Sequence, residues 1–269
     1  MKRIACGFLV MLALMAQPAL GREQRQLDAT DPGWRQRAFA ADSAMLWLLM
    51  NGSSARPTLP SAPGGKVSVS SLEIPQAART EMQACAKNFA AGKLEDSIKH
   101  AEKALRISPR WAAAHEDLGQ IYARMRQYQK AIAEFQNAAA LDGRMVTPWV
   151  SLASVYLVER QYAESEKAAR RALEIDPANS DARYVLGCTL AVAGHDLTDA
   201  VELLRASRAR FPAARLLLAN LLLKQQATEE AAAELRAYLE QPGAPQKEKV
   251  ACIVKRLTRP AQISSCALE

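Results

Sequence analysis

The sequence has few aromatic residues and only three histidines, and it lacks the recurring motifs of enzymes. Aromatic residues make up 6 % of the 269 residues, whereas the apolar share is 49 % and much of it is alanine. Large core side chains are therefore scarce, which disfavours a bulky sheet core. Alanine is the strongest helix former and lets helices approach closely. The composition favours closely packed helices.

Groups that could carry out chemistry are also sparse. His100, His115 and His195 lie at unrelated positions of the chain, and no Gly-rich phosphate loop, nucleophile elbow or metal-binding helix motif is present. We therefore expect no catalytic residue, no cofactor and no metal site, and thus no enzyme. The formal charge of +7 is spread among interleaved acidic residues. Without a basic stripe that could neutralise many phosphates, nucleic acid is not an expected partner.

The first 21 residues have the pattern of a secretory signal peptide. Lys2 and Arg3 precede an apolar run from Ile4 to about Ala16, and the small residues Ala19 and Gly21 have the spacing of a leader peptidase site. The run is shorter than the ~20 residues that suit a membrane span, so a retained anchor is the alternative. We expect an exported protein, secreted or located in the periplasm or cell envelope of a bacterium.

Removal of the leader leaves four cysteines, whose spacings fit no zinc site. Cys85 and Cys188 are expected to be small buried apolar residues. Cys252 and Cys266 could close a short terminal loop, although an even count permits disulfides without requiring them. Whether these two cysteines pair is left open.

The end of one helical segment recurs along the chain. The segments "ALRISP", "AALDG" and "ALEIDP" each end in a residue that continues a helix poorly. Pro109 and Pro177 lie 68 residues apart, with Gly143 at the midpoint, so the period is 34 residues. This is the length of a two-helix repeat unit.

When the chain is divided into units of about 34 residues, the first starting at about residue 78, two positions carry only small residues in five successive units. A small side chain is needed where the two helices of a unit cross closely. The residues at the eighth and twentieth positions are Cys85, Gly119, Ala153, Gly187 and Ala219, and Ser97, Ala131, Ser165, Ala200 and Ala231. With large residues at the seventh position, such as Leu118 and Leu152, this pattern resembles the tetratricopeptide repeat (TPR) family.

The resemblance implies an all-α fold, a right-handed α-solenoid of about five helical hairpins. The repeats would occupy residues 75–242, with units at about 78–111, 112–145, 146–179, 180–212 and 213–242. The fourth unit has one extra residue in its "GHDLT" turn. The fifth departs most, with Tyr238 where the family prefers alanine and Pro242 one place early.

Two segments flank the repeats. Residues 22–74 contain the apolar run "AMLWLLM" from Ala44 and a Pro, Gly and Ser-rich linker. That run could fold back on the first repeat, or it could anchor the protein to a membrane or a partner. The C-terminal segment, residues 243–269, carries apolar residues at helical spacing: Val250, Ile253, Val254 and Leu257. This spacing predicts a capping helix for the open end of the array, followed by a tail.

The resemblance also implies a binding surface on the concave face, built from the first helix of each hairpin. The candidate groove residues are Arg79, Met82, Glu116, Gln120, Arg124, Val150, Ser154, Tyr184, Leu216, Asn220 and Lys224, some of which could instead pack against the neighbouring helix. The basic clamp that some family members use for chaperone C-termini is missing, with Met82, Ala86 and Asp117 at its positions.

The sequence thus predicts a non-enzymatic scaffold that binds a peptide or a partner helix. The alternative is a membrane-tethered assembly factor or spacer, anchored through the N-terminal apolar segment. The pattern specifies neither the identity of the partner nor the pathway, and it leaves the oligomeric state open.

Overall fold

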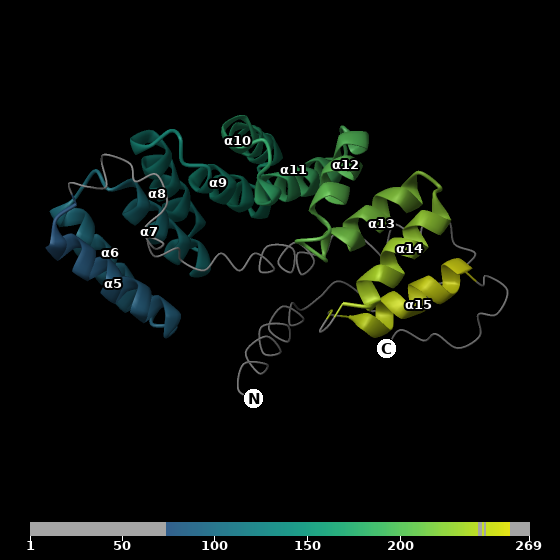
Figure 1. Ribbon diagram of the computed structural model, residues 1–269, viewed down its shortest axis with the longest axis horizontal. Coiled ribbons are helices and arrows are strands. Elements are labelled where there is room, and N and C mark those ends of the chain that lie inside the picture. The colour runs from purple at the N-terminus through teal and green to yellow at the C-terminus, as the bar shows by residue number, and fades with distance from the viewer. Residues whose placement is uncertain (1–73, 242–243, 245, 259–269) are drawn as a thin grey trace, which may run out of the picture. The chain divides into compact units, whose positions relative to one another are not determined.

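The structure, a computed structural model, describes residues 74–241, 244 and 246–258 (Figure 1). This part of the chain contains eleven α-helices and no strand, which confirms the predicted all-α fold. The helices are α5 (Gln76–Ala90), α6 (Leu94–Ile107), α7 (Ala112–Arg124), α8 (Tyr128–Leu141), α9 (Thr147–Val158), α10 (Tyr162–Ile175), α11 (Ser180–Ala193), α12 (Leu197–Ser207), α13 (Ala214–Lys224), α14 (Thr228–Leu239) and α15 (Lys247–Thr258).

The helices belong to two compact units. The described residues of one unit are 74–206, and those of the other lie between 207 and 258. In the 74–206 unit, α5 packs against α6, α7 against α8, and α9 against α10. The second helices α6, α8 and α10 also contact the first helix of the next pair, which is α7, α9 and α11 respectively. This is the nearest-neighbour packing that defines a solenoid.

The small residues predicted at the helix crossings lie where paired helices touch. A Cβ atom on Gly119 would come within 2.6 Å of the Phe135 ring on α8, and one on Gly187 would lie 3.0 Å from Leu204 on α12. Ser97, Ala131 and Ser165 are fully buried. These contacts confirm the prediction that any larger residue here would push the two helices apart.

The turn inside each hairpin contains a residue in the left-handed backbone region. Gly92 and Gly194 occupy it with φ values of 77° and 83°, where glycine carries no Cβ penalty. Arg126, Arg160 and Gln226 adopt φ values of 60°, 60° and 64° in the corresponding turns. The extra residue of the fourth turn is accommodated by a second such residue, Asp196, with φ 49°.

The 207–258 unit contains the fifth hairpin and the predicted C-terminal helix. α13 packs against α14, and α14 against α15. Tyr238, which replaces the alanine preferred by the family, is only 2 % exposed, and Leu235 is fully buried beside it in α14. α15 buries Val250, while Ile253, Val254 and Leu257 are half-buried.

Several predictions from the sequence fall on residues that the structure does not describe. They are the signal peptide at residues 1–21, the apolar run and linker before residue 74, and any pairing of Cys252 with Cys266. Among the described helices, none has both the length and the apolar character that crossing a membrane requires.

Candidate functional site

The first helices of successive hairpins form a wall in the 74–206 unit. α7 contacts α9, and α9 contacts α11. The hydroxyl of Thr147, at the start of α9, donates a 2.8 Å hydrogen bond to Oε2 of Glu116 on α7. This bond joins two helices that are separated along the chain by α8, so side chains of consecutive repeats face one surface. We call this surface, made by α5, α7, α9 and α11, the inner wall.

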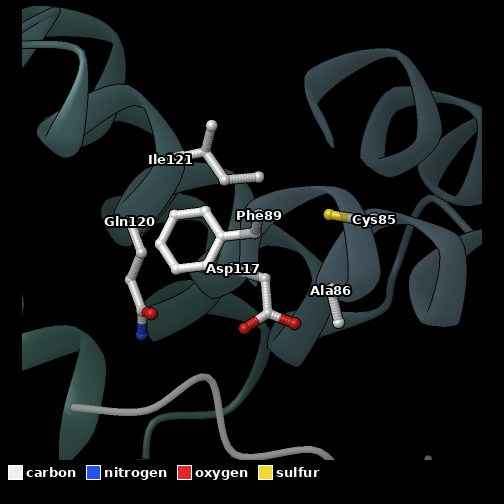
Figure 2. Close-up of a pocket in the computed structure, with 6 residues that line it drawn as sticks. All are labelled: Cys85, Ala86, Phe89, Asp117, Gln120 and Ile121. Carbon is white, nitrogen blue, oxygen red and sulfur yellow. The ribbon is translucent and has the colours of Figure 1, made fainter. Parts of the chain in front are cut away.

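A pocket opens on the inner wall between α5 and α7. Its lining consists of Cys85, Ala86 and Phe89 from α5 and Asp117, Gln120 and Ile121 from α7. In Figure 2 the carboxylate of Asp117 and the amide of Gln120 point to the same side, and Ile121 lies on the other side of the Phe89 ring. The pocket therefore combines an apolar wall with a polar edge.

Two adjacent carboxylates dominate the electrostatics of this region. Burial raises the pKa of Asp117 to about 7, with a further contribution from the charge of Glu116. Burial also raises the pKa of Glu116, although the hydrogen bonds donated by Thr147 and Gln120 oppose that shift. Both shifts have the same physical origin, because a low-dielectric surrounding disfavours the charged form.

Arg124 and Phe89 connect the same two helices at one end of the pocket. The guanidinium carbon of Arg124 lies 4.8 Å from the centroid of the Phe89 ring. This is within the range of a cation–π contact. The charge of Arg124 is thus directed at an aromatic ring, where it stabilises the α5–α7 packing.

The predicted groove residues differ in how accessible they are. Glu116, Met82 and Tyr184 are buried, with exposures of 9, 7 and 4 %. Gln120, Val150 and Ser154 are half-buried, and Arg79 and Arg124 are exposed. In the 207–258 unit, Leu216 and Asn220 are half-buried and Lys224 is exposed. The structure brings Glu116 and Gln120 together through a 3.2 Å hydrogen bond from the amide of Gln120.

Sequence reasoning did not select Phe89, Ile121 or Asp117 for the groove. The sequence pattern identifies Asp117 only as a position where the basic clamp residue is absent. A signal was nevertheless present, because Glu116 and Asp117 are consecutive carboxylates in α7, and the buried residues of this helix other than Glu116 are apolar or small. Their burial, and the lack of a cation beside them among the described residues, depend on how α5 and α9 pack around α7.

The histidines serve as partners of carboxylates. Nδ1 of His100 lies 2.6 Å from Glu81, and Nδ1 of His115 lies 2.6 Å from Glu134. The hydrogen bond with Glu134 raises the pKa of His115, which favours an ion pair between α7 and α8. Each pair links the two helices of one hairpin, which is a structural role.

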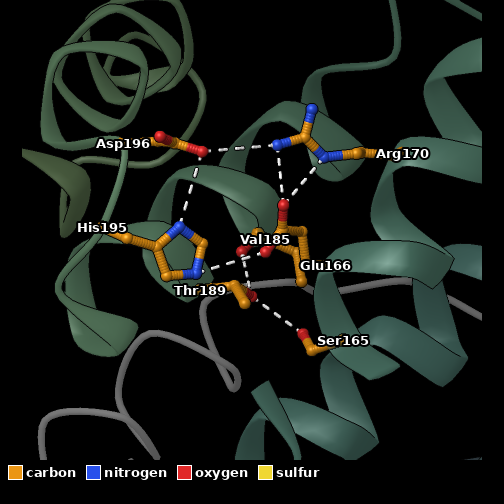
Figure 3. A network of polar contacts seen from close by, with 7 residues as sticks. All are labelled: Ser165, Glu166, Arg170, Val185, Thr189, His195 and Asp196. Atoms are coloured by element: carbon orange, nitrogen blue, oxygen red, sulfur yellow. Dashed lines mark hydrogen bonds and ion pairs between the residues drawn. The ribbon is translucent and has the colours of Figure 1, made fainter. Parts of the chain in front are cut away.

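One cluster has residue types that could bind a metal ion. Ligand atoms of Glu166, His195 and Asp196 lie within 4.8 Å of one another (Figure 3). The guanidinium of Arg170 donates hydrogen bonds of 2.9 and 2.7 Å to Glu166 and lies 3.7 Å from Asp196. Because the Arg170 guanidinium already pairs with both carboxylates, the cluster is an ion-pair network between α10 and the turn before α12.

A buried hydroxyl pair lies beneath this network. Ser165 donates a 2.7 Å hydrogen bond to the carbonyl of Ala153 and lies 2.8 Å from the hydroxyl of Thr189. The Thr189 hydroxyl also lies 2.8 Å from the carbonyl of Val185, and its single hydrogen is shared between that carbonyl and the oxygen of Ser165 (Figure 3). These bonds satisfy the buried hydroxyl groups and connect α9, α10 and α11, so they position the inner wall.

Comparisons with known proteins agree with this geometry. The tetratricopeptide repeat family matches residues 112–144, 146–179 and 188–246. A search of curated proteins found no match.

Among solved structures, PilF of Pseudomonas aeruginosa matches at 19 % identity and a TM-score of 0.58, over 69 % of this chain and 93 % of its own. A thermophilic TPR protein of Thermus thermophilus matches at 20 % identity and a TM-score of 0.52, over 67 % and 98 %. YrrB, described as a TPR protein with an unusual peptide-binding site, matches at 20 % identity and a TM-score of 0.54, over 66 % and 92 %.

At these identities the likeness to solved structures establishes the fold alone. The family matches cover three segments in which the helix pairs, the small crossing residues and the recurring turns were found independently. The chain belongs to the tetratricopeptide repeat family.

Proposed function

We propose that the protein is a non-enzymatic scaffold that binds an extended peptide or a partner helix along the inner wall of the 74–206 unit. The observation that carries this proposal is the pocket between α5 and α7 on a surface that continues through α9 to α11. Such a surface offers a side-chain pocket and a few hydrogen-bonding groups. These are the features by which helical grooves recognise a peptide segment.

The likeness to YrrB supports the same function. That structure is described as having an unusual peptide-binding site, and the two chains share the fold. TPR proteins act chiefly as interaction scaffolds, and the histidine–carboxylate pairs described above link helices within hairpins. A protein partner therefore accounts for the wall without requiring a reaction.

We also propose that the protein acts in the periplasm or cell envelope of a bacterium. This rests on the charged and apolar pattern of residues 1–21. N-terminal sequencing of the protein from an osmotic-shock fraction tests it, and the expected first residue is Arg22. An intact Met1 in protein that resists carbonate extraction would instead favour the membrane-tethered alternative.

Crosslinking at the inner wall tests the scaffold function. A photoreactive amino acid at Gln120 or Ser154, both half-buried on the wall, should form adducts with a partner in the native cell. The matched control is the same label at Gln136 on α8, which is exposed on a second helix. Equal adduct patterns from the wall and the control position would contradict a binding role for the wall.

A further inference from the structure

We propose that the pocket between α5 and α7 binds one basic side chain, a lysine or an arginine, of the partner, an inference that rests on the proposed function. It assigns a chemical class to the ligand of this pocket. The proposal depends on three features of the pocket: its carboxylates lack a cation among the described residues, its acceptors point to one side, and its wall is apolar.

The carboxylates of the pocket lack a cationic partner. Within the described part of the chain, Asp117 accepts no hydrogen bond and forms no ion pair, and Glu116 accepts hydrogen bonds only from the neutral groups of Thr147 and Gln120. Glu81 differs, because it pairs with both His100 and Lys103. The chain therefore supplies cations for Glu81, a half-buried carboxylate of the first hairpin, but leaves Asp117 in the pocket unpaired within the described residues.

The acceptors of the pocket converge on one region. The amide nitrogen of Gln120 donates to Glu116, so the amide oxygen of Gln120 is left as an acceptor. This amide and the carboxylate of Asp117 point to the same side of the pocket (Figure 2). An ammonium group has three donors and a guanidinium has five, so either group can satisfy both acceptors at once.

The apolar wall suits the stem of a basic side chain. The half-buried Ala86 and Phe89 line the pocket beside Asp117, and Cys85 and Ile121, each only 2 % exposed, complete its apolar lining. Lysine and arginine bury their methylene stems against apolar surface while the charged head reaches a polar partner. The Cys85 thiol has a pKa raised to about 12 by burial and by the charge of Asp117, so it is neutral at physiological pH and belongs to this apolar wall.

The nearby cation does not occupy the place of the ligand. Arg124 lies over the ring of Phe89 and extends from the last turn of α7, one turn beyond Gln120. The pKa of Asp117 is raised by burial and by Glu116, and no cation of the described chain lowers it. A basic ligand group would supply the missing positive charge.

Selection from a random peptide library displayed on phage tests the inference with the purified full chain. We expect peptides selected by the wild type to share a lysine or arginine at one fixed position. Asp117→Asn, which keeps the shape of the side chain, should lose that preference. Asp199→Asn is the matched control, because it removes the same charge from an exposed position on α12 and should keep the preference.

The outcomes separate the inference from the proposed function. Selected peptides without a preferred basic residue would overturn the inference and leave the scaffold function supported. Failure to select any peptide would count against both. Circular dichroism and thermal unfolding of the variants establish that a lost preference does not come from a lost fold.

A double-mutant cycle on one selected peptide makes the test quantitative. Replacing the basic residue of the peptide by methionine should weaken binding to the wild type about tenfold, and binding to Asp117→Asn less than about twofold, because desolvated charge pairs show coupling of at least this size. Fluorescence polarisation measures the four affinities. Equal losses for the two proteins would show that the basic residue binds elsewhere.

Discussion

Glu234 in the 207–258 unit and Asp117 in the 74–206 unit are both carboxylates held largely away from solvent, but their surroundings differ. Glu234 on α14 is paired with Arg208, and its Oε2 accepts a 2.5 Å hydrogen bond from Arg215. Asp117 on α7 has no cationic partner within the residues that the structure describes, and the charge of neighbouring Glu116 acts on it instead. The same repeat architecture thus contains a carboxylate with two cations and one with none.

This difference indicates which carboxylate stabilises the fold and which is available to a ligand. A buried charge that is paired within its own chain contributes to packing, and removal of one partner leaves the other unsatisfied. A buried charge without a partner lowers stability, and such groups are concentrated at functional sites. Glu234 therefore has a structural role, whereas Asp117 is the candidate for recognition.

The largest expected effect comes from breaking the paired carboxylate. Glu234→Gln should lower the free energy of unfolding by about 2–4 kcal/mol, because Arg208 and Arg215 lose their counter-charge while Arg215 stays only 18 % exposed. Urea denaturation followed by circular dichroism measures this loss. The control is Glu202→Gln, which breaks an exposed pair with Arg205 and should change stability by less than about 0.5 kcal/mol.

Glu234 would lose its assigned role if the two glutamate variants were equally stable. In that case the two arginines would be satisfied by other groups, and the contrast with Asp117 would not hold.

The unpaired carboxylate should respond in the opposite direction. Asp117→Asn should raise the free energy of unfolding by about 1–3 kcal/mol at pH 8, because it removes a half-buried, poorly solvated charge without removing a partner. The native pKa of about 7 lies above the unfolded value of 3.8, so the native state binds the proton more tightly. Protonation therefore stabilises the wild type as the pH falls from 7 towards 4.

The advantage of the asparagine variant should accordingly shrink between pH 8 and pH 5. Urea denaturation at both pH values, with Asp199→Asn as the control, checks the sign and the trend. A variant less stable than the wild type at pH 8 would mean that the ionised Asp117 has a stabilising partner.

Binding of a basic peptide should follow the same titration. Affinity should rise roughly five- to tenfold from pH 6 to pH 8, as Asp117 becomes ionised. The other groups near Asp117 are Glu116 on α7, whose raised pKa acts in the same direction, Cys85 on α5, which stays neutral, and Arg124, which lies over the ring of Phe89. Fluorescence polarisation across this range tests it, and the Asp117→Asn protein should show a flatter profile.

The smallest expected effect concerns the neutral donor to Glu116. Thr147→Val should lower the free energy of unfolding by about 0.5–1.5 kcal/mol at pH 8, because the carboxylate of Glu116 loses a 2.8 Å hydrogen bond. Thr198→Val on α12, an exposed threonine, is the control. If both substitutions have the same effect, the bond between α7 and α9 does not contribute to the stability of the inner wall.

The sequence predicted the repeat fold from positions where only one size of side chain fits. Gly119 and Gly187 face Phe135 and Leu204 across the helix crossings, so the small residues have a steric cause that recurs every repeat. The prediction of the groove residues was less complete than the prediction of the fold. Tyr184 occupies a groove position but is buried, because side chains on first helices also pack against the next repeat.

The sequence by itself determined the helical repeats, since the period, the small crossing residues and the helix ends are local properties of each 34-residue unit. Only the tertiary structure decided which acidic residues are paired. Glu116 and Asp117 are visible as neighbours in the sequence, but the burial that raises their pKa values arises from the packing of α5 and α9 around α7. The same packing leaves Asp117 without a cation beside it among the residues that the structure describes. A charge acquires its chemistry from the groups that surround it in space.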